Sequence, residues 1–218
     1  MHTFVVSAPS GTGKTTLNRK LISENADVLM SVSHTTRKPR QGEVNGVHYH
    51  FIDREAFMRL VEADAFIEWA DVHHNYYGTS FAELERIKGL GKSPLLEIDV
   101  QGWNKAKPAL NDAVSIFILP PSMKELWHRL ESRGSDDLKT RWVRFKNAHA
   151  EIASAENYDF FIENKSIELA YQELVAIIGG QKPAKNRALE GMKICQKLNE
   201  EFQHADWIQE LREKLEIN

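Results

Sequence analysis

The sequence predicts an α/β fold, in which a doubly wound parallel sheet carries a small inserted subdomain and is followed by a helical tail. Near the N-terminus, a β-branched run leads through a glycine-containing loop directly into a segment of helical periodicity. Further apolar runs at residues 94–100, 113–119 and 159–164 alternate with segments of the same helical periodicity. Strands separated by helices imply parallel pairing, with helices on both faces of the sheet.

Length, charge and cysteine content narrow the class of protein. The 218 residues suit one large domain, or one domain with insertions. The net charge of −3 gives no reason to expect a nucleic acid or a membrane surface as a partner. The single cysteine, Cys195, excludes an internal disulfide and a cysteine-rich zinc site. The first strand begins by residue 4, which leaves no room for a signal peptide, and no apolar run has spanning length. We therefore expect a cytoplasmic protein.

The loop Ala8-Pro9-Ser10-Gly11-Thr12-Gly13-Lys14-Thr15 lies between the first strand and the first helix. Its two glycines let successive N–H groups point at a polyphosphate, and the following helix adds the positive end of its dipole. Lys14 can then reach the β- and γ-phosphates, and the Thr15 hydroxyl can bind Mg²⁺. The pattern predicts a nucleoside triphosphate site, with Ala8 in place of the usual first glycine.

Residues 33–79 are expected to form a small, mostly antiparallel insert behind this loop. Turn residues separate several short segments of alternating polarity here, and one segment of helical periodicity follows an N-cap residue. The expected elements are strands at residues 28–36, 47–52 and 66–72 and a helix at 54–62, which Asp53 would cap.

The strand after the insert carries acidic residues. Ser80 and Glu83 form a capping box that opens a helix, and the apolar run at 94–100 follows it. Glu97 and Asp99 interrupt this run near its end. A carboxylate at the C-terminal end of a buried strand, in a protein with a phosphate loop, is where an acid that organises Mg²⁺ belongs.

The C-terminal residues have a different pattern. After a linker at 182–185, apolar residues from Leu189 to Leu215 recur every three or four positions. This predicts one amphipathic helix, or two that break near residues 204–206. Seven basic and seven acidic residues follow residue 180, and this balance argues against a membrane role. The tail could form a homo-oligomer interface, dock on the core of its own chain or bind another partner.

The insert contains residues suited to a second phosphate. Arg37 and Arg40 supply forked guanidinium groups, and Tyr49 and Tyr77 supply phenolic donors. Each could be an ordinary surface residue. Their combination in one short insert behind a phosphate loop favours a phosphorylated acceptor.

Glu68 is unusual because it stands in an otherwise apolar strand. A carboxylate presents two acceptors, which match the N1–H and N2–H₂ donors of guanine, whereas adenine has an acceptor at N1. The hydroxyls of Ser33 and Thr79 could donate to guanine O6. An outward-facing strand charge is the alternative explanation for Glu68, and the insert as a whole favours a guanine-reading pocket.

Residues 1–180 resemble the guanylate kinase family, whose members make GDP from GMP and ATP. The resemblance rests on blocks in the family's order and spacing, at residues 10–15, 31–37, 39–40, 42–46, 66–69, 75–78 and 98–102. It implies a core at residues 1–32 and 80–180, a GMP-binding insert at 33–79 and a lid at about 129–144. The family normally ends near residue 180, so residues 181–218 form a helical C-terminal extension outside the resemblance.

The resemblance also implies roles for individual residues and Mg²⁺ as the cofactor that accompanies ATP. Thr15 would hold the metal, and Asp99 is a second candidate for it. The catalytic residues would be Lys14, Arg40, Arg129, Arg133 and Arg144, which neutralise the transferring phosphoryl group. ATP would be bound by Ala8, Pro9, Ser10, Gly11, Thr12, Gly13, Lys14, Thr15, Thr16 and Asn164. GMP would be bound by Ser33, Arg37, Arg40, Glu43, Tyr49, Glu68, Tyr77, Thr79, Glu97 and Asp99.

Two alternative functions stay open. A kinase of this fold that acts on another phosphorylated acceptor, such as a ribose bisphosphate, would lack the base reader at Glu68. A guanylate-kinase-like interaction module without catalytic activity would lack the intact Gly13-Lys14-Thr15 sequence. The lid departs from the family pattern at residues 136–139 and 141–144.

Overall fold

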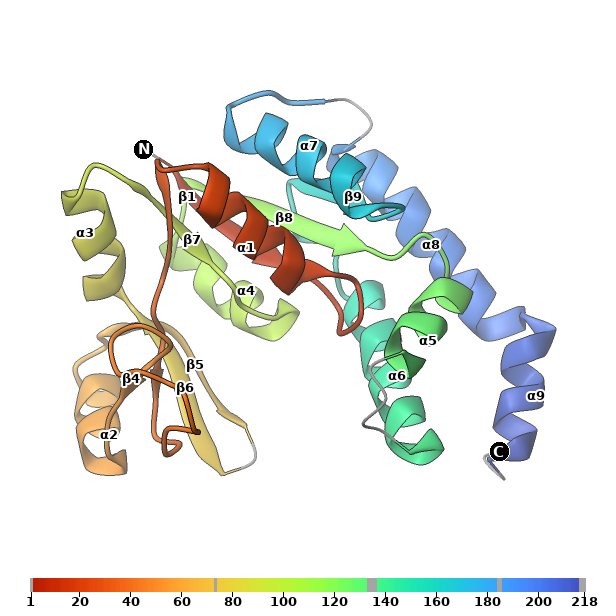
Figure 1. Ribbon diagram of the computed structural model, residues 1–218, viewed down its shortest axis with the longest axis horizontal. Coiled ribbons are helices and arrows are strands. Elements are labelled where there is room, and N and C mark those ends of the chain that lie inside the picture. The colour runs from red at the N-terminus through yellow and green to blue at the C-terminus, as the bar shows by residue number, and fades with distance from the viewer. Residues whose placement is uncertain (1, 73, 133–136, 184–185, 216–218) are drawn as a thin grey trace. The chain divides into compact units, whose positions relative to one another are not determined.

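The computed structural model describes residues 2–72, 74–132, 137–183 and 186–215, and it has the α/β architecture that the sequence predicts (Figure 1). The larger sheet has the strand order β2 (Val28–Met30), β7 (Ser93–Leu96), β1 (Thr3–Ser7), β8 (Ala113–Leu119) and β9 (Phe160–Glu163). The chain divides into two compact units. We call Met1–Val5 with Ile22–Val114 the insert unit, and Val6–Leu21 with Ser115–Asn218 the phosphate-loop unit.

The phosphate-loop unit contains β8, β9 and most of the helices. Its strands β8 and β9 are parallel, with Ile116 beside Phe160. The side chains of Ser122, Asp137 and Ser166 each accept a hydrogen bond from the backbone N–H three residues on, which fixes where three helices begin. The helices are α1 (Lys14–Glu24), α5 (Met123–Glu131), α6 (Leu138–Ala153), α7 (Ile167–Ile178), α8 (Ala188–His204) and α9 (Asp206–Lys214).

The insert unit combines the β2–β7 part of the larger sheet with a smaller, four-stranded sheet. In the smaller sheet, β3 pairs antiparallel with β6 and parallel with β4, and β5 pairs antiparallel with β6, so it is mostly antiparallel as expected. Its order is β4 (His50–Phe51), β3 (His34–Thr35), β6 (Asn75–Ser80) and β5 (Phe66–Val72). The remaining elements are α2 (Arg54–Glu62), α3 (Phe81–Gly89), α4 (Val100–Ala106) and the short 3₁₀ helix η1 (Lys107–Ala109).

Three expected strands are shorter in the structure than the sequence pattern predicted. Residues 28–36 form not one strand but two, β2 and β3, which belong to different sheets. Of residues 47–52, only the two residues of β4 are in a strand. The run at 94–100 leaves the strand after Leu96, because Asp99 accepts a 2.7 Å hydrogen bond from the backbone N–H of Gly102 and caps α4 instead.

The C-terminal extension packs within the phosphate-loop unit. It forms two helices, α8 and α9, with the break at Ala205 that the pattern allowed. In Figure 1, α8 runs past β9 and then past α5, and it contacts β9, α5 and α6. The apolar faces of the two helices are buried at Cys195, Leu198, Phe202 and Ile208. Of the three expected fates of the tail, the structure shows docking on the core of its own chain. Within the described residues, no helix is both long and apolar enough to cross a membrane.

Candidate active site

The phosphate loop is a tight main-chain turn that opens into α1. Gly11 and Gly13 both have φ of +95°, a backbone conformation that residues with a side chain rarely adopt. Between them, Thr12 is buried and donates to the Pro9 carbonyl through both its backbone N–H (3.3 Å) and its hydroxyl (2.8 Å). Lys14 is the first residue of α1, and the next two residues, Thr15 and Thr16, are exposed. The loop therefore has the conformation that anion binding by main-chain amides requires.

Side chains from α5 and from the end of β9 pack directly against the loop. A Cβ atom on Gly11 would lie only 3.0 Å from Leu126 and 3.1 Å from Leu130 of α5. A Cβ atom on Gly13 would lie 2.6 Å from the amide nitrogen of Asn164. That amide donates a 2.6 Å hydrogen bond to the carbonyl of Thr12. Asn164 is only 1% exposed, so in this structure it supports the loop from within the core.

The predicted catalytic arginines have different surroundings. The guanidinium group of Arg129, on α5, donates to Glu125 (2.8 Å) and to the carbonyl of Asn164 (3.0 Å). It therefore lies next to the residue whose amide holds the carbonyl of Thr12 in the phosphate loop. Arg144 is half-buried on α6. Arg133 lies outside the described residues. In the insert unit, the side chain of Arg40 is exposed.

The predicted phosphate-binding residues of the insert form one charged cluster. Arg37 makes a bidentate ion pair with Glu43, with distances of 2.8 and 2.9 Å, and its guanidinium group lies 5.6 Å from the centre of the Tyr49 ring. The rings of Tyr49 and Tyr77 are 5.9 Å apart. Hydrogen bonds from Arg37 and from the backbone N–H of Arg40 lower the pKa of Glu43 to about 2. The structure therefore brings together the side chains of four of the five predicted residues, while the fifth, Arg40, contributes its backbone N–H.

The predicted base-reading residues also meet within the insert unit. One carboxylate oxygen of Glu68 accepts a hydrogen bond from the Thr79 backbone N–H (3.1 Å), and the Thr79 hydroxyl lies 3.1 Å from that of Ser33. Burial raises the pKa of Glu68, although the contacts with Thr79 oppose the shift. A Cβ atom on Gly102 would lie 3.4 Å from the other Glu68 oxygen and 3.3 Å from Asp99, so glycine leaves room for both acids.

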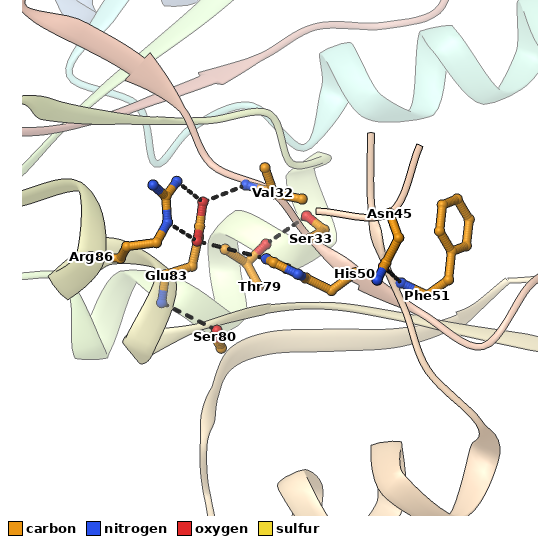
Figure 2. Close-up of polar contacts among 9 residues, drawn as sticks. All are labelled: Val32, Ser33, Asn45, His50, Phe51, Thr79, Ser80, Glu83 and Arg86. Carbon is orange, nitrogen blue, oxygen red and sulfur yellow. Dashed lines mark hydrogen bonds and ion pairs between the residues drawn. The ribbon is translucent and has the colours of Figure 1, made fainter. Parts of the chain in front are cut away.

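Glu83 is a supporting residue whose contacts the sequence pattern did not predict. Its backbone N–H donates to the Ser80 hydroxyl, as a capping box requires, but its carboxylate does not return to Ser80. Instead, the carboxylate accepts from the Val32 backbone N–H (2.9 Å) and pairs with the guanidinium group of Arg86 (2.8 Å), as Figure 2 shows. Burial opposes ionisation, but these hydrogen bonds hold the pKa of Glu83 below its usual value. Glu83 thus fixes the backbone directly before Ser33.

The acids considered for metal binding, Glu97 and Asp99, lie shortly after the end of β7. Asp99 and Glu97 are both exposed, and Asp99 uses one oxygen to cap α4. No group of three or more His, Cys, Asp or Glu side chains among the described residues could hold a metal ion. Mg²⁺ is often held by one or two protein oxygens together with substrate phosphates, and the exposed hydroxyl of Thr15 fits that requirement.

Comparison with known proteins gives one consistent result. Residues 1–181 match the family model described as guanylate kinase. The guanylate kinase of Neisseria gonorrhoeae is 45% identical over 186 residues, which cover 85% of this chain and 91% of that relative. The guanylate kinase of Nitratidesulfovibrio vulgaris is 48% identical over 173 residues, which cover 79% of this chain and 84% of that relative. The crystal structure of guanylate kinase from Anaplasma phagocytophilum, 34% identical, aligns with a TM-score of 0.63 over 90% of this chain and 94% of that one. The chain therefore belongs to the guanylate kinase family.

Proposed function

We propose that this protein phosphorylates GMP to GDP with ATP as the donor. The observation that carries the proposal is the contact set of Glu68. A half-buried carboxylate, ordered by Thr79 and accompanied by the Ser33 hydroxyl, stands in the same insert as the Arg37–Glu43 cluster. The guanylate kinases to which the chain is similar have the activity that their name states.

The pocket chemistry selects guanine over adenine. The two oxygens of ionised Glu68 would accept from the N1–H and N2–H₂ groups of guanine, and the hydroxyls of Ser33 and Thr79 would donate to O6. Adenine would present its N1 acceptor to the carboxylate, so that two acceptors would face each other and Glu68 would retain only Thr79 as a donor, which is unfavourable. Arg37 and Arg40, with the phenols of Tyr49 and Tyr77, would hold the phosphate of GMP.

Phosphoryl transfer to GMP requires no protein nucleophile, because the acceptor oxygen is already anionic. The bond between the γ-phosphorus of ATP and its bridging oxygen breaks, and a bond to a GMP phosphate oxygen forms. The loop amides and Lys14 would hold the ATP phosphates, and Arg129 and Arg144 would neutralise the charge that develops during transfer. Mg²⁺ bound with ATP, with Thr15 as its protein ligand and Asp99 as a further candidate, would supply additional charge neutralisation.

A coupled assay for ADP formation tests this proposal. The protein would be given ATP and, one at a time, GMP, dGMP, IMP, AMP, CMP and UMP. We expect the highest kcat/KM with GMP and weaker use of IMP, which lacks the N2 amino group that the second oxygen of Glu68 would bind. Formation of ADP with none of the monophosphates would overturn the proposal.

The substitution Glu68→Gln tests the base reader directly. It replaces one of the two acceptors by a donor, so we expect the KM for GMP to rise about 10- to 100-fold and discrimination against AMP to fall. The matched control is Glu62→Gln, which removes an exposed charge of the same insert. Unchanged selectivity in Glu68→Gln would exclude Glu68 as the base reader.

A further inference from the structure

The C-terminal helices lie outside the region that matches the family, and the proposed function assigns them no role. One of their side chains reaches the helix that supports the phosphate loop. The carboxylate of Glu201, on α8, accepts hydrogen bonds from the backbone N–H groups of Met123 (2.9 Å) and Lys124 (3.0 Å). These are the first two residues of α5, whose N–H groups have no partner inside the helix. Glu201 therefore caps α5 from outside, in addition to its own N-cap residue Ser122.

The capped helix is in direct contact with the phosphate loop. Leu126 and Leu130 of α5 lie so close to Gly11 that a Cβ atom there would be 3.0 to 3.1 Å from them. Arg129, also on α5, donates to the carbonyl of Asn164, whose amide in turn holds the carbonyl of Thr12. A shift of α5 along its axis would therefore move the groups that fix the loop's conformation.

The start of the extension contacts the other support of the loop, strand β9. Arg187 forms an antiparallel bridge with Phe160, and the amide of Asn186 donates to the carbonyl of Phe161 (2.8 Å). Gly191 of α8 lies so close to the Phe161 ring that a Cβ atom would be 2.0 Å from it. Since β9 runs directly into Asn164, the extension contacts two of the elements that reach the loop; Ile167 of α7 also lies close to Gly13.

An aromatic cluster holds α8 and α9 in place on α6. The rings of Phe202 and His149 are stacked at 3.8 Å, and Phe202 also lies 5.4 Å from Phe145. Trp207 of α9 lies 5.9 Å from Phe145, and the guanidinium group of Arg212 is 5.3 Å from the Phe202 ring. Because Phe202 follows Glu201 directly, this packing fixes where the Glu201 carboxylate lies.

We propose that the C-terminal extension is a brace for the phosphate loop, with Glu201 as a positioning residue that acts through α5. In this proposal, neither Glu201 nor the rest of the extension contacts a nucleotide. Its effect is on ATP, because the residues that it orders belong to the phosphate-loop unit, and it leaves GMP binding unchanged. The brace therefore depends on the proposed function, because that function is what assigns ATP to the phosphate loop.

Titration calorimetry with Mg²⁺ and ATP, in the absence of GMP, tests the brace. We expect Glu201→Ala, which removes both acceptors, to raise the Kd for ATP about three- to tenfold, as the loss of a helix cap would. Glu201→Gln keeps one acceptor and should give a smaller rise. Glu200→Gln removes the neighbouring exposed charge on the same helix and should leave the Kd unchanged.

Two further variants separate positioning from general stabilisation. Ser122→Ala removes the other cap of α5 and should raise the Kd for ATP in the same way, without full additivity with Glu201→Ala. Leu84→Ala, a core substitution in the insert unit, lowers Tm without touching α5 and should leave the Kd for ATP unchanged well below Tm. Deletion of the whole extension is less informative, because it uncovers buried side chains of β9 and α6.

Three results would contradict the role of the extension as a brace. They are an unchanged Kd for ATP in Glu201→Ala, a rise of the Kd for ATP in Glu200→Gln as large as that in Glu201→Ala, and a loss of GMP binding in Glu201→Ala as large as its loss of ATP binding. Failure of the proposed function is a separate result. It would appear as a wild-type chain that binds ATP in the calorimeter and forms no GDP in the coupled assay.

Discussion

The two proposed phosphate sites of this protein are built from different chemical groups. In the phosphate-loop unit, main-chain amides and Lys14 form the proposed anion site. Neutral groups support the loop: the side chains of Leu126 and Leu130 and the amide of Asn164. In the insert unit, charged side chains form the site and hold one another in place, as Arg37 and Glu43 do. One site is shaped by steric fit and the other by ion pairing.

This difference predicts different weaknesses. Main-chain amides have fixed dipoles and do not titrate, so, apart from the loss of Lys14, substitutions that add volume or change backbone conformation should damage this site most. A side-chain site depends on the protonation and the partner of each group, so changes of charge and of pH should damage it most. Volume, charge and pH are therefore the variables that test the comparison.

The largest effect is expected from Lys14→Ala, which removes the one charged side chain of the phosphate loop. Loss of a donor that is positioned on developing charge commonly costs about 10²- to 10³-fold in kcat, and we expect at least this loss. The KM for GMP should stay near the wild-type value in the same coupled assay. Lys20→Ala is the control, because it removes a charge of α1 that is paired on the surface with Glu168. Retained GDP formation by Lys14→Ala would contradict the assignment of the loop.

The second effect tests steric fit with a methyl group. Gly13→Ala must adopt φ near +95° and would place Cβ 2.6 Å from the Asn164 amide, so the hydrogen bond to Thr12 must break. Strain of this kind costs about 1–3 kcal/mol, and we expect the KM for ATP to rise about 10- to 100-fold.

Gly91→Ala is the matched control for Gly13→Ala. It has φ of +73° and no atom within 4 Å of the added methyl, so it carries backbone strain without a steric contact. It should lower Tm and leave the KM values for both nucleotides unchanged. An unchanged KM for ATP in Gly13→Ala would show that the fit between loop and Asn164 has no bearing on binding.

Local rules explain how much of this fold could be predicted from the sequence. The phosphate loop, the strand at 113–119 and the helix at 167–178 each have their signals within a few residues of chain, and the structure has them where the pattern placed them. The Asp53 cap is of the same kind, since its carboxylate accepts from the Ala56 backbone N–H.

Tertiary contacts explain what could not be predicted. In a capping box the carboxylate of Glu83 would bind the backbone at Ser80. Instead, it accepts a hydrogen bond from the backbone N–H of Val32, which is 51 positions away in the sequence. The helix start at Asp99 is an exception, because it depends on a local cap of the same kind as that of Asp53, while the apolar residues around it predict a strand. The docking of the extension depends on a fit between Gly191 and Phe161 that no periodicity encodes.

A smaller effect, confined to GMP, is expected from Glu43→Gln. Glutamine keeps one acceptor for Arg37 but loses the charge, and a hydrogen bond to an ionised group is stronger than one between neutral groups. We therefore expect the KM for GMP to rise about fivefold, with the KM for ATP unchanged. Glu55→Gln breaks an exposed Glu–Arg pair of the same insert and should change neither value. An equal effect of the two substitutions would mean that Arg37 needs no ordering by Glu43.

The smallest effect is a pH dependence that belongs to the insert alone. Burial raises the pKa of Glu68, so its carboxylate becomes protonated at a higher pH than that of an ordinary glutamate. A protonated Glu68 offers one acceptor fewer to guanine, so the KM for GMP should rise as the pH falls through this pKa. Glu43, with a pKa of about 2, stays ionised throughout.

The phosphate of GMP itself gains a proton near pH 6, and this must be separated from the titration of Glu68. Glu68→Gln shares the phosphate titration but lacks the carboxyl group, so the ratio of KM values for GMP in the variant and the wild type isolates Glu68. We expect this ratio to shrink severalfold as the pH falls, because the wild type loses an advantage that the variant never had. Over the same range, the KM for ATP should follow one curve in both proteins. If the ratio is constant with pH, Glu68 does not titrate in the working range, and its charge state cannot be what distinguishes the side-chain site from the main-chain site.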